Sequence, residues 1–194
     1  MHRPLAETLE QLSQERDRFW LAQDTHQTLA QDQLLTRWVR KHGLPTVQKV
    51  CACVWRTGAQ GPELLSFVHP TAGHQLVKGT LEAGEALDRA LLRELAEEAG
   101  LIRSEAGHYL GLLHCGNTGG ITSGGRFEHQ IWHLFALPAR GDEPEHWSHT
   151  ASGSLDEDGL EFRFFWQPLQ HPPEGFAPVY QRVIQLLQAF LSHD

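Results

Sequence analysis

Three glutamates near the middle of the chain, Glu94, Glu97 and Glu98, are spaced so that they can act together. In an α-helix with about 3.6 residues per turn, this spacing puts the three carboxylates on one face. Like charges so placed repel each other and destabilise the helix unless a cation lies beside them. Carboxylate oxygens are hard ligands, which suit Mg²⁺ or Mn²⁺ better than zinc or copper. The spacing therefore favours a site for a hard divalent cation, with a solvated acidic helix face as the ordinary alternative.

The glutamates belong to a longer pattern that runs from Gly79 to Leu101, GTLEAGEALDRALLRELAEEAGL. This pattern resembles the Nudix box, with every defining position filled. The wider chain is similar to Nudix domains over about residues 46 to 194. The resemblance implies an α/β fold, specifically a Nudix-type α/β/α sandwich with a mixed β-sheet. It also implies Mg²⁺-dependent hydrolysis of a phosphoanhydride (pyrophosphate) bond in a nucleoside diphosphate derivative, which makes a small-molecule nucleotide the expected partner.

The resemblance assigns the metal ligands within the box. Glu94, Glu97 and Glu98 are expected to bind Mg²⁺, with Mn²⁺ as an alternative, and the backbone carbonyl of Gly79 is expected to complete the set. Divalent ions can clamp phosphoryl oxygens and activate a bound water. A rigid helix keeps such ligands in a tight geometry.

Supporting roles follow from the same resemblance. Arg93 is expected to act in catalysis with Glu97 and Glu98, by orienting and partly neutralising the carboxylates, with Glu85 as its partner. An ordinary surface ion pair is the alternative for Arg93 and Glu85. Lys78, directly before the box, is expected either to touch a substrate phosphate or to be an exposed lysine.

The general base stays open at this point. In the family it is a box glutamate or an acid from a distant loop. The loop candidates in this sequence are Glu128, Glu143, Glu145, Asp156, Glu157 and Asp158.

Periodicity predicts the elements that must position these residues. Leu87, Leu91 and Leu95 give a helix over residues 85–99 an apolar stripe next to its carboxylates. Residues 138–158 read as a long polar loop, and the glycine-rich run GNTGGITSGG as a hairpin tip. The predicted strands are 47–56, 64–68, 75–78, 109–114, 127–137 and 160–166, and a final amphipathic helix covers 178–191.

Residues 1–45 form a predicted N-terminal helical extension, followed by the Nudix hydrolase domain at 46–194. Leucines at positions 5, 9 and 12 make one apolar stripe, and a second follows the capping residues Asp24 and Thr25. A pair of helices packed on the domain's own surface, a substrate lid and the arm of a homodimer all stay open.

Bulk properties exclude some partners and places. The formal net charge of −8 argues against duplex nucleic acid, which needs many phosphate-neutralising Lys and Arg. No stretch approaches the roughly 20 apolar residues that span a membrane. Three cysteines without paired spacing, Cys51, Cys53 and Cys115, favour a reducing compartment and therefore a cytoplasmic protein. Cys51 and Cys53 read as small core residues, and His129 and His133 as satisfied or exposed side chains.

Two other functions compete with hydrolysis. A non-catalytic nucleotide-sensing domain is one, although it has little need of the full set from Arg93 to Glu98. An isomerase acting on isopentenyl diphosphate is the other, but it requires a proton-donating cysteine in a recognisable context. Within the family, the run LVKGTLEAGE is similar to the start of the box in the dinucleoside polyphosphate group.

Overall fold

The computed structural model of the chain describes residues 3–117, 127–154, 157–170 and 175–192. They form two compact units, Met1–Gln48 with Leu112–Trp132, and Lys49–Gly111 with His133–Asp194. None of the described helices is both long and apolar enough to cross a lipid bilayer. The elements are α1 (Arg3–Leu21), α2 (Thr25–Lys41), β1 (Thr46–Gly58), β2 (Gly61–His69), β3 (Gly73–Gln75), β4 (Lys78–Thr80), α3 (Leu87–Ala99), β5 (His108–Asn117), β6 (Glu128–Pro138), β7 (His146–Thr150), β8 (Glu161–Pro168) and α4 (Pro178–Leu191).

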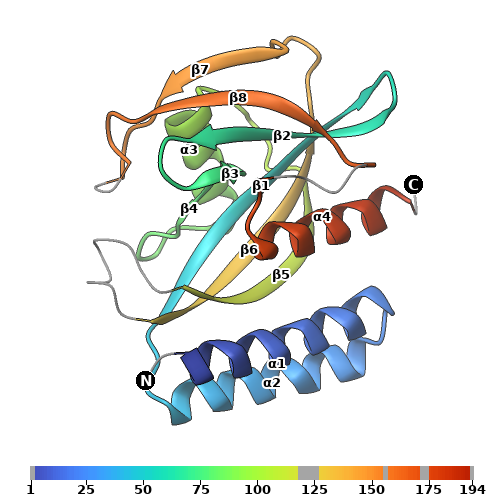
Figure 1. Cartoon of the computed structure of the whole chain (residues 1–194), viewed down its shortest axis with the longest axis vertical. Helices are drawn as coiled ribbons and strands as arrows, with labels where there is room; N and C mark the ends of the chain where they lie inside the picture. The colour runs from blue at the N-terminus through green and yellow to red at the C-terminus, as the bar shows by residue number, and fades with distance from the viewer. Residues whose placement is uncertain (1–2, 118–126, 155–156, 171–174, 193–194) are drawn as a thin grey trace. The chain divides into compact units, whose positions relative to one another are not determined.

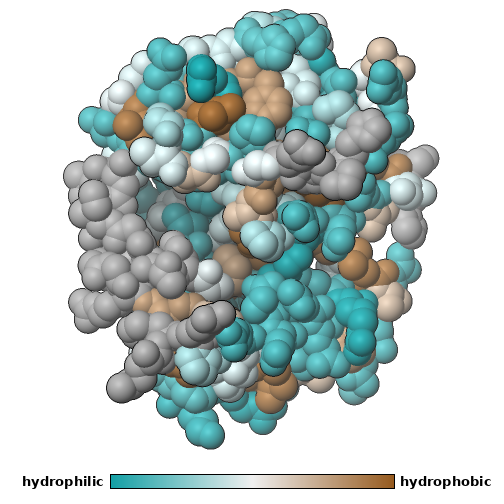
Figure 2. Space-filling model, viewed as in Figure 1, coloured by the Kyte–Doolittle hydropathy of each residue, from teal (hydrophilic) through white to brown (hydrophobic). Residues whose placement is uncertain are grey.

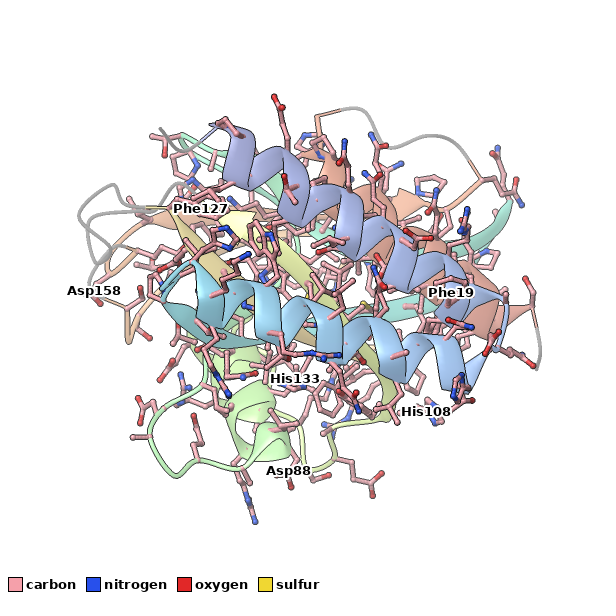
Figure 3. The ribbon with its side chains drawn as sticks, turned by 90° about the horizontal axis from the view of Figure 1, so that it is seen from below. Phe19, Asp88, His108, Phe127, His133 and Asp158 are labelled. Atoms are coloured by element: carbon pink, nitrogen blue, oxygen red, sulfur yellow. The ribbon has the colours of Figure 1, made fainter. Side chains whose placement is uncertain are left out.

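The first unit contains the two N-terminal helices, which confirms the predicted helical extension ahead of the main domain. The helices α1 and α2 run side by side in opposite directions (Figure 3). Asp24 caps α2, because its carboxylate accepts a hydrogen bond from the Gln27 N–H at 3.0 Å. Leu9 and Leu35 are fully buried between the helices, and Phe127 packs against the same cluster. The visible side of the pair is mostly hydrophilic (Figure 2), as expected for an amphipathic hairpin.

A buried polar network lies in the same unit. Arg16 Nε donates to Asp32 Oδ1 at 3.0 Å, and His114 Nε2 lies 3.1 Å from the same oxygen. His114 Nδ1 is 2.9 Å from His129 Nε2, and His129 Nδ1 is 3.2 Å from Thr46 Oγ1. Because Asp32 only accepts, His114 Nε2 and Arg16 Nε both donate to it. Burial, with the nearby His114, lowers the pKa of His129 to about 4. His129 is thus a satisfied side chain, as predicted.

The strand order of the sheet is β5-β6-β1-β2-β8-β7 (Figure 1). Two short strands extend it, β3 beside β2 and β4 beside β1. The β1–β4 register places Val50 opposite Gly79 and Cys51 opposite Lys78. This pairing brings the start of the box to the middle of β1.

Alternation along β1 divides its side chains between two faces. Val50 and Val54 pack in a buried core with Leu91 and Leu95 of α3. Cys51 and Cys53 therefore point to the opposite face, where both are buried and free, as predicted. The remaining helix, α4, begins with Pro178 in its first turn, also as predicted.

The structure corrects the prediction of a continuous loop over residues 138–158. His146–Thr150 form β7, which pairs with β8 so that Trp147 lies opposite Phe164. The strand alternates between exposed and half-buried residues, so it carries no apolar pattern from which it could be predicted. The helix α3 begins at Leu87 rather than at residue 85. Most of the run GNTGGITSGG lies outside the described residues.

Candidate functional site

The carboxylates of the box are carried by α3. Leu91 and Leu95 are fully buried and hold the helix against the sheet. On the adjoining face, Glu94 is 7% and Glu98 is 4% exposed, while Glu97 is half-buried. Two of the three predicted ligands are therefore among the few buried acidic side chains, which is rare for glutamate without compensation.

Arg93 supplies part of that compensation. Its guanidinium donates to Glu85 through Nε and Nη2, at 3.0 and 2.9 Å, and through Nη1 to Glu94 at 2.7 Å and to Glu97 at 3.0 Å. Nη2 also donates to the Thr80 carbonyl at 3.1 Å. The hydrogen bond from Arg93 lowers the pKa of Glu85 below its usual range. The structure thus joins Arg93 and Glu85 in the pairing that the sequence predicts.

The loop before α3 reaches the same carboxylates through its backbone. A Cβ atom on Gly79 would lie 1.7 Å from Glu94 Cδ, so any side chain at this position would displace the carboxylate. The neighbouring Lys78 N–H donates to Glu98 Oε2 at 3.0 Å. Gly79 is therefore required here for close approach rather than for an unusual backbone conformation.

The buried carboxylates lack enough positive charge. Burial raises the pKa of Glu94, although Arg93 opposes the shift. Burial raises the pKa of Glu98 well above its ordinary value, and repulsion from Glu157 adds to the effect while Lys78 opposes it. A proton or a bound cation would therefore stabilise both carboxylates, because burial disfavours an uncompensated negative charge.

Two lysines stand beside the carboxylates, and one of them was not identified from the sequence. Lys49 Nζ donates to Thr80 Oγ1 at 3.0 Å. Burial, with the charge of Lys78, lowers the pKa of Lys49 to about 8. Burial also opposes the charge on Lys78, but Tyr180 and Glu98 outweigh it and raise the pKa of that ammonium. Lys49 could have been identified from the sequence, because it is a charged residue within the largely apolar strand VQKVCACVW.

Among the predicted loop acids, Glu157 lies nearest to the box. Its carboxylate raises the pKa of Glu98 by repulsion, and its Oε1 is 3.9 Å from His69 Nε2. His69 Nδ1 accepts the N–H groups of Thr71 and Ala72, each at 3.1 Å. A neutral His69 therefore carries its proton on Nε2, directed at Glu157. Burial lowers the pKa of His69, which favours this neutral form.

The other candidate bases are engaged elsewhere or lie apart. Glu143 and Glu145 each form an ion pair with an arginine, and Glu128 accepts a hydrogen bond from a neighbouring glutamine amide. Asp158 is exposed, and Asp156 lies outside the described residues.

The donor set fits a hard divalent cation by its chemistry. Glu94 and Glu98 present buried carboxylates beside the Gly79 backbone, and burial disfavours their charges. As the side chains lie, Arg93 and the Lys78 N–H hold these oxygens, and no three acidic, His or Cys side chains of the described residues are gathered as a metal group. An entering cation must therefore compete with Arg93 for Glu94.

Comparisons with known proteins identify the family and the fold. A sequence profile of the NUDIX domain matches residues 47–187. The fold is similar to that of the MutT protein from Methanosarcina mazei Go1, at 18% identity and a TM-score of 0.53, over 78% of this chain and 97% of that one. It is also similar to a C. elegans Ap4A hydrolase in a binary complex, at 18% identity and 0.52, over 76% and 99% of the two chains. A third similar structure is the NUDIX domain of Shewanella oneidensis NrtR complexed with ADP ribose, at 14% identity and 0.51, over 78% and 92%.

No curated protein sequence matches the chain. The structural likenesses show the fold alone, whereas the profile covers most of the chain and includes the whole box from Gly79 to Leu101. The chain therefore belongs to the Nudix hydrolase superfamily.

Proposed function

We propose that the protein is a divalent-cation-dependent pyrophosphohydrolase that cleaves a phosphoanhydride bond in a nucleoside diphosphate derivative. One observation carries the proposal: Glu94 and Glu98 are buried on a single helix face, against the backbone of Lys78 and Gly79, with raised pKa values. An acidic face that was merely solvated would be exposed.

In this proposal the lysines bind the pyrophosphate group and the carboxylates bind the cation. Lys78 and Lys49 carry the positive charge that a pyrophosphate group needs in this acidic protein. Glu94 and Glu98, with the Gly79 carbonyl and with Glu97 once released from Arg93, would hold Mg²⁺ or Mn²⁺. Such an ion, when bound, supplies charge neutralisation and a more acidic water.

Glu157 is the general base in this proposal. Its carboxylate accepts a proton from water as the water oxygen attacks phosphorus, and the bridging oxygen leaves with the electron pair of the broken bond. His69 lies beside Glu157, with Nε2 3.9 Å from Oε1, so it contributes a nearby polar group and not a direct hydrogen bond. Arg93 positions Glu94 and Glu97.

The nucleotide class is supported by similar structures. Two of them are an Ap4A hydrolase and a NUDIX domain complexed with ADP ribose, so a nucleotide is the natural substrate to test for this chain.

The test is hydrolysis of a nucleotide panel by the purified chain with Mg²⁺, with products identified by mass spectrometry. The panel contains diadenosine tetraphosphate, ADP-ribose, NADH and the nucleoside triphosphates. Turnover of at least one member to a shorter nucleotide is expected, with loss of activity in Glu98→Gln. The matched control is Glu82→Gln, which removes the same charge from an exposed position of the box.

Two results would overturn the proposal. One is a panel without any turnover, and the other is equal activity of Glu98→Gln and wild type. Tight nucleotide binding without turnover would instead assign the chain to the nucleotide-sensing alternative.

A further inference from the structure

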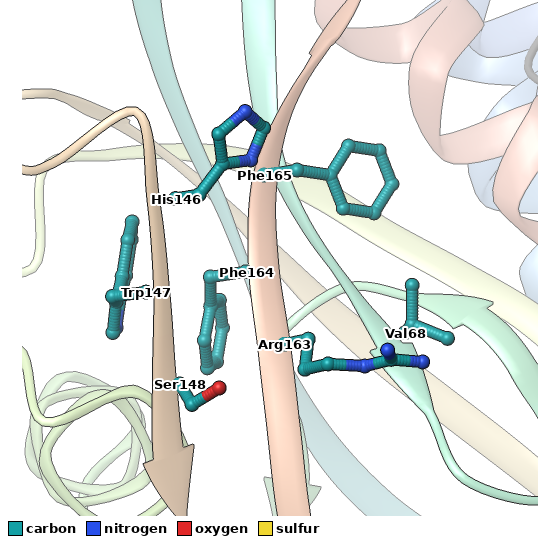
Figure 4. Close-up of a pocket in the computed structure, with 7 residues that line it drawn as sticks. All are labelled: Val68, His146, Trp147, Ser148, Arg163, Phe164 and Phe165. Atoms are coloured by element: carbon teal, nitrogen blue, oxygen red, sulfur yellow. The ribbon is translucent and has the colours of Figure 1, made fainter.

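The strand β7 and the loop after it are docked on the C-terminal end of α3. The last carbonyl groups of a helix have no partner within the helix, so another segment must supply donors. The Trp147 indole, which stacks on Phe164 with 4.7 Å between centroids (Figure 4), donates through Nε1 to the Ala99 carbonyl at 3.1 Å. The Ser152 N–H supplies a second hydrogen bond, to the Glu97 carbonyl at 3.2 Å. The loop is therefore tied to the helix that carries the box carboxylates.

The loop that joins β7 to β8 is closed by its own backbone. At its base the Ala151 N–H donates to the Leu160 carbonyl at 2.8 Å, and the Gly159 N–H donates to the Ala151 carbonyl at 2.9 Å. Within the loop, the Asp158 N–H donates to the Ser154 carbonyl at 2.8 Å. Ala151 is also buried in the core that α3 shares with the sheet. The two halves of the loop therefore hold each other in place.

Gly153 is the place where this loop lies against the side chain of a box glutamate. A Cβ atom on Gly153 would lie 2.6 Å from Cδ and Oε2 of Glu97 and 2.8 Å from Oε1. Side chains do not make contacts this short, so glycine is what lets the loop backbone approach the carboxylate. The carboxylate has little room to move away, because Oε2 accepts a hydrogen bond from Arg93 Nη1 at 3.0 Å. A side chain at position 153 would therefore displace the loop relative to α3.

The other half of the same loop carries Glu157. Besides burial, repulsion from the Glu157 carboxylate raises the pKa of Glu98, as expected for an acid near the box. Glu157 Oε1 also lies 3.9 Å from His69 Nε2, at the end of β2. A general base must lie within hydrogen-bond reach of the proton that it accepts, and a displacement of about 1 Å can cost about 100-fold in rate. The contact of the loop with α3 therefore determines whether Glu157 is placed to act.

We propose that Gly153 is a positioning residue, which keeps Glu157 in register with the carboxylates of α3 by letting the loop lie against Glu97. The inference rests on the proposed function, because it takes Glu157 as the general base. The lysines proposed to bind the pyrophosphate group take no part in the contact. A side chain at position 153 is therefore expected to lower kcat and to leave KM nearly unchanged.

The experiment measures kcat and KM of wild type, Gly153→Ala, Glu157→Gln and the double variant with Mg²⁺. The substrate is the probe that wild type hydrolyses fastest among diadenosine tetraphosphate, ADP-ribose, NADH and the nucleoside triphosphates. Gly153→Ala is expected to lower kcat at least about tenfold, with KM within about twofold of wild type. In the Glu157→Gln background, the same change is expected to lower kcat less than about twofold, because the base that it positions is already absent.

Gly159→Ala, in the same loop, is the matched control. Gly153 and Gly159 have φ of 83° and 80°, so alanine strains both backbones alike. Among the described residues, no atom beyond its chain neighbours lies within 4 Å of a Cβ on Gly159. Both variants are expected to unfold at lower urea than wild type, with kcat lowered in Gly153→Ala alone. Equal kcat values in the two variants, or an undiminished tenfold loss in the Glu157→Gln background, would overturn the inference.

Hydrogen exchange separates this inference from the proposed function. The exchange rate of the Ser152 amide, measured by NMR on the full chain without ligand, reports the hydrogen bond to Glu97. Faster exchange in Gly153→Ala than in Gly159→Ala, without turnover in any protein, would support the contact and overturn the hydrolase. Equal exchange rates would overturn the contact. If Gly153→Ala fails to fold, Gly153→Asn takes its place, because asparagine tolerates positive φ and carries the same Cβ atom.

Discussion

Replacing Arg93 by alanine tests the electrostatics of the site in the absence of any ligand. The substitution removes all five hydrogen bonds that the guanidinium makes, four of them to carboxylates. Glu94, whose side chain is only 9% exposed, then loses its closest positive charge. Three carboxylates that Arg93 held together are left to repel one another.

The magnitude follows from the burial of the partners. Removing one partner of a fully buried ion pair costs about 3–5 kcal/mol. The Arg93 side chain is 24% exposed, and solvent screens the weaker part of the network, so we expect a loss of roughly 2–3 kcal/mol. The loss is expected to shrink as the pH falls, because protonation of Glu94, whose pKa is already raised, removes the uncompensated charge.

The assay is urea unfolding of wild type, Arg93→Ala and Arg93→Lys at pH 8 and pH 5.5. Lysine keeps one charge but not the planar fork, so Arg93→Lys is expected to recover about half of the loss. A cost of Arg93→Ala below about 1 kcal/mol would refute the reasoning, since exposed pairs are worth about 0.2–1 kcal/mol. A larger cost at pH 5.5 than at pH 8 would refute it as well.

Three further predictions concern single residues. Gly79→Ala is expected to displace Glu94 and to lower turnover at least about tenfold, with a stability cost of about 1–3 kcal/mol. The control Gly141→Ala meets no atom within 4 Å but strains a backbone with φ of 88°, so it should cost about 1 kcal/mol of stability and leave turnover intact. His129 has a pKa of about 4 in the folded chain and an ordinary pKa when unfolded, so unfolding takes up a proton as the pH falls. The free energy of unfolding is therefore expected to fall between about pH 6.5 and pH 4, by up to roughly 3 kcal/mol, as measured by urea unfolding. If His129→Gln lost stability with pH as steeply as wild type, this explanation would be wrong. Glu157→Gln is expected to reduce kcat at least about 100-fold with little change in KM, and an equal rise in KM would show instead that Glu157 binds substrate.

The helix that carries the carboxylates could be predicted from the sequence, because its two faces depend only on the spacing of residues within one short segment. The spacing of Glu94, Glu97 and Glu98 sets their common face, and the leucines beside them set the buried one. Pairing of Arg93 with Glu85 followed from the same short segment. Each of these relations spans no more than a few turns of chain.

Other parts of the site depend on contacts between distant segments. Lys49 reaches Thr80 only because β1 pairs with β4 in one register, and Glu157 reaches His69 only through the loop after β7. The strand β7 itself has no apolar alternation and was predicted as loop. The division at residue 45, the roles of the site residues and the homodimer stay predictions.

The most direct test of the account is calorimetric titration of Mn²⁺ into wild type and Glu98→Gln at neutral pH, with Glu82→Gln as the control. The account predicts one cation bound by wild type and by Glu82→Gln, and an affinity at least about tenfold weaker in Glu98→Gln. Equal affinities in all three proteins would contradict the claim that the buried carboxylates of α3 hold the cation.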